Sequence, residues 1–495
     1  MESAVVASFL LLLCCQAAAA AAAGAISSHR RPPPLTRHYA SPLVRRRHVT
    51  SPGTAAATVP AMVQYETRYY TQRLDHFNAL PASYGTFQQR YLINDTFWAG
   101  KTSPIFLYAG NEGDIDLFTN NTGFMWESAP RFGAMLVFVE HRYYGESMPF
   151  GSKEKATKGY LSVTQALADF TSFVLSLKSN LSAPAAPVVV FGGSYGGMLA
   201  VWMRLKYPHI VMGAVASSAP IRSFYHLTDP YAFYDRVTDD FKSESNNCYD
   251  VLRGSWAELD GLLATKNGSA LLRRSFNMCN GSSVRDIPSL LESAMVNAAM
   301  TDYPTPSGFL APLPGYPVRE MCRAVDHPSS GNDTLAKVRD AMNVYYNSTG
   351  ASPCLGGEED GDPYGMYDGW NWQACTEMVL MTYGLSNRSI IQPPWPFNFT
   401  DDIGNVLKGS ASNIIFFNGL RDPWSTGGVL KSISKSIIAL VEPKGAHHVD
   451  LRFSSKEDPE WLKKVRAKET RIIARWLKQY YKDEAVSGPV WIPPN

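Results

Sequence analysis

The sequence has little charge, few cysteines and almost no long apolar run. Charged residues make up 18% of the 495 residues, 46 basic against 44 acidic, so the formal net charge is only +2. Such a balance gives no electrostatic reason to expect a nucleic-acid partner. With 45% hydrophobic residues and a mean hydropathy of −0.16, a disordered chain, a collagen and a polytopic membrane protein are also poor fits. The composition is that of a globular chain, long enough for two or three domains.

The one long apolar run stands at the N-terminus. Residues 5–15 are apolar and an alanine tract and Gly24 follow them, which predicts a secretory signal over residues 1–24. A membrane anchor is the alternative, because about 20 apolar residues can span a bilayer, but the small residues at the end of the run favour cleavage. Residues 25–60 are rich in Pro, Arg and Ser and contain no acidic residue, which is typical of a linker or propeptide. No later stretch approaches 18 apolar residues, so no membrane association is expected after signal removal.

The cysteines are few and confined to one region. Two of the seven lie inside the predicted signal, and none of the other five forms a CxxC pair, so a zinc site is not predicted. An odd number in an oxidising compartment implies two disulfides and one free or intermolecular thiol, with the connectivity left open by the spacing. The five are Cys248, Cys279, Cys322, Cys354 and Cys375.

Nine N-glycosylation sequons support a secretory route. Each has the form N-x-S/T without proline, and a cytosolic chain of this length would show fewer by chance. Their asparagines are Asn94, Asn120, Asn180, Asn267, Asn280, Asn332, Asn347, Asn387 and Asn398.

Short apolar segments alternate with helical spacing in two parts of the chain. Strands are predicted at residues 105–108, 135–140, 188–191, 213–217, 414–417 and 437–441, and helices at 165–177, 198–207 and 458–482. This alternation predicts a mostly parallel sheet with helices on both faces. Residues 222–400 break the rhythm with further helical patterns at 255–263, 287–300 and 333–345 and hold all five cysteines. We therefore predict a core made of residues 61–221 and 401–495, with residues 222–400 inserted.

The strongest local signal is a nucleophile motif. Gly192-Gly-Ser194-Tyr-Gly196 fits G-x-S-x-G and lies directly between an apolar strand and a helical stretch. A serine on such a sharp turn is exposed at the end of the strand, and the flanking glycines let neighbouring backbone come close. An incidental serine in a glycine-rich turn is the alternative, which the strand–turn–helix context disfavours.

Two later loops supply partners for Ser194. Asp422 follows the predicted strand 414–417, and the pair His447-His448 follows the strand 437–441, in the Ser, Asp, His order of this architecture. All three loops leave the same edge of a parallel sheet. We predict Ser194 as nucleophile, His447 as base and Asp422 as orienting acid, with His448 packing beside the base and Asp450 as a weaker candidate for the acid.

The developing oxyanion needs two donors. One is the amide of Tyr195, the residue after the nucleophile. The second is expected from the glycine-containing loop Gly110-Asn-Glu-Gly-Asp after the strand at 105–108, with Gly110 as the candidate, although the same spacing fits a plain turn.

Taken together, the motifs resemble the lysosomal prolyl carboxypeptidase and dipeptidyl-peptidase II family of serine peptidases. The resemblance rests on Gly193-Ser-Tyr-Gly-Gly-Met, Asn418-Gly-x-x-Asp-Pro-Trp, Gly445-Ala-His-His-x-Asp-Leu-Arg, Gln72-Arg-Leu-Asp-His-Phe-Asn, Glu140-His-Arg-Tyr-Tyr-Gly-Glu-Ser and Gln373-Ala-Cys-Thr-Glu, which occur in the family's order. It implies an α/β-hydrolase core, a disulfide-containing helical cap over the site, and exopeptidase cleavage after proline without a metal or organic cofactor.

The resemblance also implies a proline pocket and a disulfide hypothesis. Met198, Trp424 and Leu380 would wall the pocket, with Glu112 and Asn371 as further lining residues. We hypothesise that Cys248 pairs with Cys322 and Cys279 with Cys354, which leaves Cys375 free.

Which end of a peptide is trimmed depends on the ionic group that grips it. A dipeptidyl peptidase needs a carboxylate for the substrate ammonium, whereas a carboxypeptidase needs donors or a cation for the terminal carboxylate. The neutral Asn371, where the aminopeptidase branch would carry an acid, favours a Pro-X carboxypeptidase. Arg421 and Arg142 are possible carboxylate anchors, although surface salt bridging is the favoured role of each.

The rival functions are a dipeptidyl peptidase, an esterase with the same triad, and a catalytically inactive binding module. The expected partners are short proline-containing peptides, and a homodimer is kept open. The expected location is the lysosome, the vacuole or the cell exterior.

Overall fold

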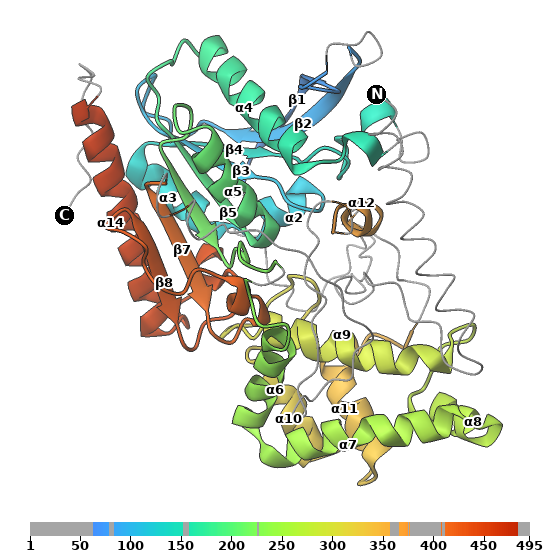
Figure 1. The fold of residues 1–495 in the computed structure, drawn as a ribbon. Coiled ribbons are helices and arrows are strands. Elements are labelled where there is room, and N and C mark those ends of the chain that lie inside the picture. The colour runs from blue at the N-terminus through green and yellow to red at the C-terminus, as the bar shows by residue number, and fades with distance from the viewer. Residues whose placement is uncertain are drawn as a thin grey trace. The chain divides into compact units, whose positions relative to one another are not determined.

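A mostly parallel sheet forms the centre of the chain in this computed structural model, which describes residues 63–78, 84–151, 158–224, 227–356, 366–374, 376, 407 and 411–483. The strand order within the described residues is β1-β2-β4-β3-β5-β6-β7-β8 (Figure 1). The strands from β4 through β3 to β8 run parallel, while β2 is antiparallel to both of its neighbours. Their bounds are β1 Glu66–Arg73, β2 Thr86–Asn94, β3 Ile105–Ala109, β4 Met135–Val139, β5 Val188–Gly193, β6 Gly213–Ser217, β7 Ile414–Gly419 and β8 Ile437–Glu442.

The six strands predicted from apolar runs are present, whereas the edge strand β1 and its antiparallel neighbour β2 were missed. Every residue of β3, β4, β5, β6 and β7 is buried, as expected where helices cover both faces of a parallel sheet. β1 and β2 carry polar residues on their exposed positions and give a much weaker apolar signal.

Helices cover both faces of the sheet. Successive residues of β3 enter two different hydrophobic clusters, one packed against α4 (Val163–Asn180) and α5 (Ser194–Lys206) and the other against α3 (Gly123–Phe132) and α14 (Glu460–Asp483). Figure 1 shows α14 running beside β7 and β8. The chain thus has the predicted α/β-hydrolase core.

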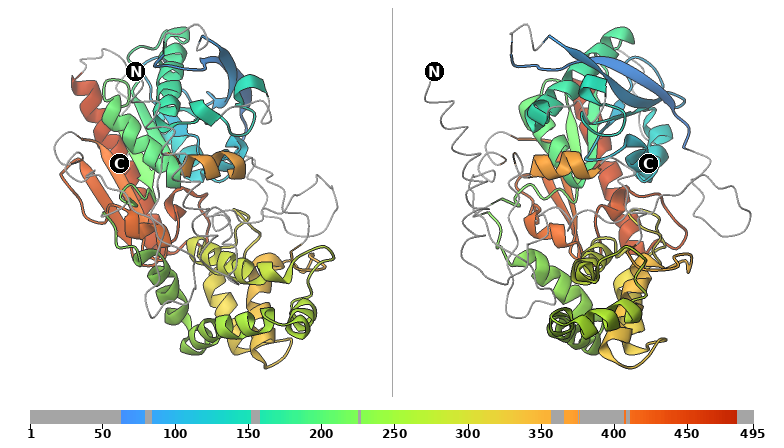
Figure 2. Two further views of the ribbon diagram at one scale, coloured as in Figure 1. Left: turned by 45° about the vertical axis from the view of Figure 1, so that its right-hand side comes forward. Right: turned by 90° about the vertical axis from the view of Figure 1, so that its right-hand side faces the viewer.

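The inserted helices form a bundle with a hydrophobic core of its own. Figure 2 shows this bundle from two further sides. Its helices are α6 Ala232–Glu244, α7 Asn246–Leu263, α8 Lys266–Ser275, α9 Ile287–Met300, α10 Pro317–Asp326 and α11 Thr334–Tyr346. Three of them, α7, α9 and α11, match predicted helical patterns, whereas α6, α8 and α10 were missed. Trp424 from the loop after β7 joins the bundle core and ties it to the sheet.

Two disulfides cross-link the bundle. Cys248 bonds to Cys322 and Cys279 bonds to Cys354, so the hypothesised pairing is confirmed. Cys375 lies outside the described residues, and its free state stays a prediction. The bonded cysteines are 74 and 75 residues apart in the sequence. Joining such distant residues restricts the unfolded chain and so stabilises the bundle.

One helix of the predicted insertion packs on the sheet domain instead of on the bundle. The ring of Trp370 in α12 (Met366–Gln373) lies 5.3 Å from that of Tyr195 in α5. Gln373 accepts a 3.0 Å hydrogen bond from the Tyr144 hydroxyl and donates to that of Tyr195. The end of the insertion therefore contributes to the neighbourhood of the nucleophile.

The remaining elements are short. They are α2 (Ile115–Thr119) and the 3-10 turns η2 (Pro149–Gly151), η3 (Lys158–Tyr160), η4 (Val284–Asp286), η6 (Pro423–Gly427) and η7 (Val449–Leu451). The predicted signal and linker lie outside the described residues. In the part of the chain that the structure describes, no helix is long and apolar enough to cross a membrane.

Candidate active site

The backbone at Ser194 has the strained geometry of a nucleophile elbow. Ser194 begins α5 directly after β5, and its φ of 57° lies in the left-handed region that residues with a side chain rarely adopt. A Cβ on Gly196 would lie 2.2 Å from Asn111 Oδ1, and a Cβ on Gly192 would lie 2.1 Å from the carbonyl oxygen of Gly196. The two motif glycines are therefore required by close backbone and side-chain approach.

Asn111 braces this elbow and was not singled out from the sequence. Its Nδ2 donates to the carbonyl oxygen of Gly193 at 2.7 Å, and its Oδ1 accepts from the Tyr108 hydroxyl at 2.9 Å. The side chain thus links the loop after β3 to the residue before Ser194. Asn111 belongs to the motif Gly110-Asn-Glu-Gly-Asp, in which roles were predicted only for Gly110 and Glu112.

Asp422 and His447 form a buried pair at the carboxyl ends of β7 and β8. Asp422 Oδ2 lies 2.7 Å from His447 Nδ1, and its Oδ1 accepts from the amide of Trp424 at 3.0 Å. Both side chains are almost wholly buried. The amide of His447 donates to the carbonyl oxygen of Met300 at 3.0 Å, so α9 of the bundle helps to place this loop.

His448 and Asp450 have other partners. The amide of His448 donates to Ser218 Oγ at 2.7 Å, and its ring meets Phe309 edge-on. Burial lowers the pKa of His448 well below its usual value, and the charges of His447 and Arg452 act in the same direction, so this imidazole is neutral. Asp450 accepts from Ser217 Oγ. The acid that faces His447 is therefore Asp422.

Asp450 also faces a second buried carboxyl, which gives a stability prediction. Burial raises the pKa of Asp450 to about 6, and burial together with the Asp450 charge raises that of Glu469 in α14 well above its usual value. Two raised carboxyl pKa values mean that the fold favours the protonated forms. Their stabilising contribution is complete below the unfolded pKa near 4 and is lost as the pH rises through 6 and beyond. Buried neutral histidines act in the opposite direction, so a variant must be compared with the wild type.

We expect Glu469→Gln to gain thermal stability relative to the wild type as the pH is raised from 5 to 7.5, because its amide cannot ionise. The measurement is the melting temperature at both pH values. Glu460→Gln, at the exposed start of the same helix, is the matched control and should show no such trend. The prediction would be contradicted if the melting temperatures of Glu469→Gln and the wild type changed by the same amount between the two pH values.

One of the two predicted oxyanion donors is engaged elsewhere. The amide of Tyr195 lies in the first turn of α5, as expected for a donor toward the nucleophile. The amide of Gly110 instead donates to the carbonyl oxygen of Val139 at 3.0 Å, as part of the pairing between β3 and β4. The prediction of Gly110 is therefore wrong, because the parallel ladder continues one residue beyond β3. The next amide along the loop is that of Asn111.

Ser194 and His447 line one small cavity, about 70 Å³, between the core and the bundle. Of the predicted pocket residues, Met198, Trp424 and Glu112 line it, whereas Leu380 lies outside the described residues. Asn371 belongs to α12, but its side chain also lies outside them. Further lining residues come from the stretch between β6 and β7, lie outside the motifs and were not predicted. These are Val296, Asn297, Met300, Phe309, Leu310 and Trp370.

Glu112 and Asn297 present unpartnered polar atoms in this lining. Among the described residues, neither Glu112 Oε2 nor Asn297 Nδ2 has a hydrogen-bond partner, although both atoms are buried. Desolvation raises the pKa of Glu112 to about 7, against smaller lowering effects that include the charge of His447 and the Asn111 side chain. A buried polar atom without a partner is costly and often marks a ligand contact.

The two arginines considered as carboxylate anchors are held by acidic residues. Arg142 is fully buried, and both its Nε and its Nη2 lie 2.6 Å from the Asp169 carboxylate. Arg421 binds Asp302 at 2.5 Å and Glu244 at 3.0 Å, which joins the loop after β7 to the bundle. Neither lines the cavity at Ser194, so the structure agrees with the favoured salt-bridging role and not with the anchor alternative, although the Arg142 pair is buried and not at the surface.

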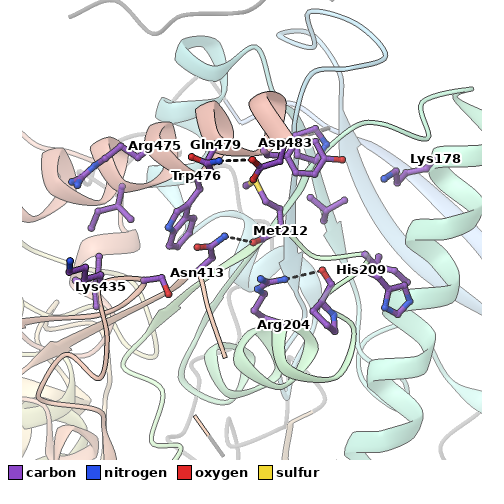
Figure 3. Close-up of a pocket in the computed structure, with 18 residues that line it drawn as sticks. Lys178, Arg204, His209, Met212, Asn413, Lys435, Arg475, Trp476, Gln479 and Asp483 are labelled. Atoms are coloured by element: carbon purple, nitrogen blue, oxygen red, sulfur yellow. Dashed lines mark hydrogen bonds between the residues drawn. The ribbon is translucent and has the colours of Figure 1, made fainter. Parts of the chain in front are cut away.

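A larger cavity, about 440 Å³, lies at the opposite edge of the sheet (Figure 3). It is lined by the first residue of β5, by residues just before β6, β7 and β8, and by α14, with Arg204, His209 and Lys435 among its polar side chains. Ligands of parallel sheets bind at the carboxyl ends of the strands, and this cavity contains none of the predicted catalytic residues. We therefore place the active site at the smaller cavity.

The described sequons are accessible to differing degrees. Asn180, Asn267, Asn280 and Asn332 are exposed, whereas Asn94, Asn120 and Asn347 are partly buried. Asn387 and Asn398 lie outside the described residues. Among the described residues, no cluster of His, Cys, Asp and Glu could hold a metal ion.

Comparison with known proteins assigns the family. The family model of serine carboxypeptidase S28 matches residues 72–403 and 398–469. The chain belongs to the serine carboxypeptidase S28 family. The resemblance seen in the motifs is thereby confirmed, and S28 membership makes this protein a serine hydrolase of the exopeptidase type.

Relatives in the S28 family cover most of the chain. A lysosomal Pro-X carboxypeptidase from Pongo abelii is 39% identical over 86% of this chain and 92% of its own length. Prolyl carboxy peptidase like protein 5 from Caenorhabditis elegans is 36% identical over 84% of this chain and 90% of its own length. The thymus-specific serine protease of Homo sapiens is 28% identical over 89% of this chain and 91% of its own length.

Among solved structures, a proline iminopeptidase from Mycobacterium smegmatis aligns over 84% of this chain and 100% of its own, with 12% identity and a TM-score of 0.38. At that TM-score the alignment adds nothing to the fold that the strand order establishes.

Proposed function

We propose that this S28 protein is a Pro-X carboxypeptidase that releases a C-terminal residue after proline. The observation that carries the proposal is the strained Ser194 elbow, which lines one cavity with His447, the histidine of the buried Asp422–His447 pair. The relatives named as lysosomal Pro-X carboxypeptidases support it, since they match this chain over most of their length.

In this mechanism Ser194 Oγ attacks the prolyl carbonyl while His447 takes its proton. Asp422 holds the imidazole through Nδ1, which leaves Nε2 for the serine, and stabilises the imidazolium that forms. The amides of Tyr195 and Asn111 donate to the oxyanion. His447 then protonates the departing amine, and water attacks the acyl-enzyme along the same route.

The apolar walls of the cavity suit a pyrrolidine ring. Met198 follows Ser194 by one helical turn, and Trp424 follows Asp422 within η6, so both walls are fixed by the elements that carry the catalytic groups. A thioether and an indole offer adaptable and flat apolar surface, respectively. Such a pocket selects proline by shape and leaves the scissile carbonyl near Ser194.

The protein is proposed to act in the secretory route, in a lysosome, a vacuole or outside the cell, on short proline-containing peptides. The sequence supports this route through the signal predicted at residues 1–24, the linker or propeptide predicted at residues 25–60 and the nine sequons. The same proposal includes the division of the chain into a core, residues 61–221 and 401–495, and an insertion, residues 222–400. It also includes the homodimer.

The test compares three substrates for the wild-type enzyme at pH 5. We expect efficient hydrolysis of an N-blocked prolyl-phenylalanine with a free carboxylate, and values of kcat/KM at least about tenfold lower for an X-Pro amide with a free N-terminus and for a simple acyl ester. Preference for the X-Pro substrate would instead show a dipeptidyl peptidase, and preference for the ester an esterase. Folded protein that does not react with a fluorophosphonate probe would indicate a binding module.

A further inference from the structure

The cavity at Ser194 raises a specific problem for a carboxypeptidase. A substrate that ends beside the nucleophile brings a carboxylate into the site, yet among the described residues no lysine or arginine lines the cavity. Arg142 and Arg421 are paired with acids elsewhere. Within the described residues, the groups left to hold the carboxylate are hydrogen-bond donors other than guanidinium and ammonium groups.

Two side chains of the lining have the required unpartnered atoms. Asn297 Nδ2, on α9 of the bundle, is a buried donor without an acceptor in the described part of the chain. Glu112 Oε2, on the loop after β3, is buried without a donor within the same residues. An ionised Glu112 would repel a substrate carboxylate, whereas a protonated one can donate its O–H to it.

We propose that Glu112 in its protonated form and Asn297 together bind the terminal carboxylate of the substrate. The inference rests on the Pro-X carboxypeptidase function proposed above. Glu112 keeps its proton and shares it in an O–H···O hydrogen bond, which is stronger than a neutral one because the acceptor is charged. The α/β core and the inserted bundle each supply one of the two donors, which gives the bundle a direct role in exopeptidase specificity.

The surroundings of Glu112 favour the protonated form at acid pH. Burial raises its pKa to about 7. Of the titratable groups in the cavity lining, His447 and His448 come from the loop after β8, and Tyr108 lies behind the cavity in β3. The cavity side chains of α2, α5, α9 and α12 carry no charge. These are Leu117 and Phe118, Tyr195 and Met198, Val296, Asn297 and Met300, and Trp370.

Because Glu112 gains and loses its proton, the preference of the enzyme for substrates with a free C-terminal carboxylate should depend on pH. The substrate carboxylate, with a pKa near 3.5, is ionised throughout the range from pH 4.5 to 8. The proton on Glu112 is therefore the group that changes in this contact. Above pH 7 the ionised Glu112 faces an ionised substrate, and binding of the free acid should weaken.

The experiment measures N-blocked prolyl-phenylalanine and its C-terminal amide side by side from pH 4.5 to 8. The ratio of the two kcat/KM values is the readout, because ionisation of His447 affects both substrates and cancels. For the wild type we expect the free acid to be preferred about 10- to 100-fold at pH 5, as for a hydrogen bond to a charged group, with the preference falling above pH 7.

Three variants separate the roles. Glu112→Gln keeps a neutral donor and should retain the preference for the free acid up to pH 8. Glu112→Ala and Asn297→Ala should each raise KM for the free acid about 10-fold or more, with smaller changes for the amide and in kcat, since the contact is made in the ground state and the transition state alike. Glu258→Gln, exposed on α7, is the matched control and should follow the wild type.

The results that would overturn the proposal are distinct from failure of the proposed function. If Glu112→Gln follows the wild-type pH curve, or if Glu112→Ala keeps the preference for the free acid, Glu112 does not bind the carboxylate. If Glu112→Gln instead loses activity on substrates with a free N-terminus, the side chain acts as an ionised ammonium receptor. If the wild type cleaves neither blocked peptide but reacts with a fluorophosphonate, it is the Pro-X function that fails.

Discussion

Ser194→Ala and His447→Ala are each expected to lower kcat by about 10⁶-fold, with no loss of folded structure. The two groups act as one unit, since Ser194 Oγ is a poor nucleophile unless His447 removes its proton. The double variant should therefore be no slower than either single variant. Asp422→Asn should cost about 10⁴-fold, because an amide at that position stabilises the wrong tautomer of His447. The measurements are kcat on an N-blocked prolyl peptide and covalent labelling by a fluorophosphonate.

Two other histidines provide controls for the assignment of the base. His448→Ala leaves the 2.7 Å contact between Asp422 and His447 in place and should reduce kcat far less than His447→Ala. His209→Ala changes an exposed residue at the opposite edge of the sheet and should have wild-type kinetics. Labelling of Ser194→Ala, or a larger loss in His448→Ala than in His447→Ala, would refute the proposed triad.

The core of this fold could be predicted because its parallel strands are buried on both faces. Residues 105–108 and 188–191 are apolar without interruption, residues 213–217 consist of small and apolar residues up to Ser217, and the three segments matched β3, β5 and β6 closely. β1 was missed because its residues, Glu-Thr-Arg-Tyr-Tyr-Thr-Gln-Arg, are mostly exposed at the edge of the sheet. Its stability comes from pairing with β2, and an isolated sequence window carries little sign of such a partner.

The three proposed catalytic residues could be brought together from the sequence because each follows a strand and the carboxyl ends of parallel strands meet at one edge of the sheet. The loop after β3 was harder, because register decides which amide is free. Gly110 looked suitable for the oxyanion, but the ladder between β3 and β4 continues to its amide. The bundle side of the cavity could not be predicted at all. Asn297 and Phe309 line the cavity at Ser194 only through the tertiary packing of the insertion, and neither belongs to one of the motifs.

Arg142 shows how a charged motif can be misread as a surface or binding feature. Within Glu140-His-Arg-Tyr-Tyr, the sequence gives no sign that the side chain is fully buried. Its guanidinium pairs with the buried carboxylate of Asp169 and donates to the carbonyl oxygens of Leu74 and Arg73 at 2.9 and 3.1 Å. It therefore links the end of β1 to α4, far from any role in binding substrate.

Arg142→Met is accordingly expected to lower the free energy of unfolding by about 3–5 kcal/mol, because the buried Asp169 loses its guanidinium partner and keeps only the His76 ring at 2.7 Å. Arg142→Met/Asp169→Leu should recover part of that loss, since it removes the orphaned charge. Arg68→Met, which breaks an exposed pair with Glu66, is the matched control and should leave the free energy of unfolding nearly unchanged. Urea unfolding measures all three variants.

The kinetics of Arg142→Met distinguish a structural role from a carboxylate anchor. At a temperature where the variant remains folded, KM for the N-blocked free acid should equal that of the wild type, because Arg142 does not line the cavity at Ser194. If KM rises for the free acid but not for the C-terminal amide, Arg142 takes part in binding the substrate carboxylate. A loss of stability below about 1 kcal/mol would mean that water or another cation replaces the guanidinium at Asp169.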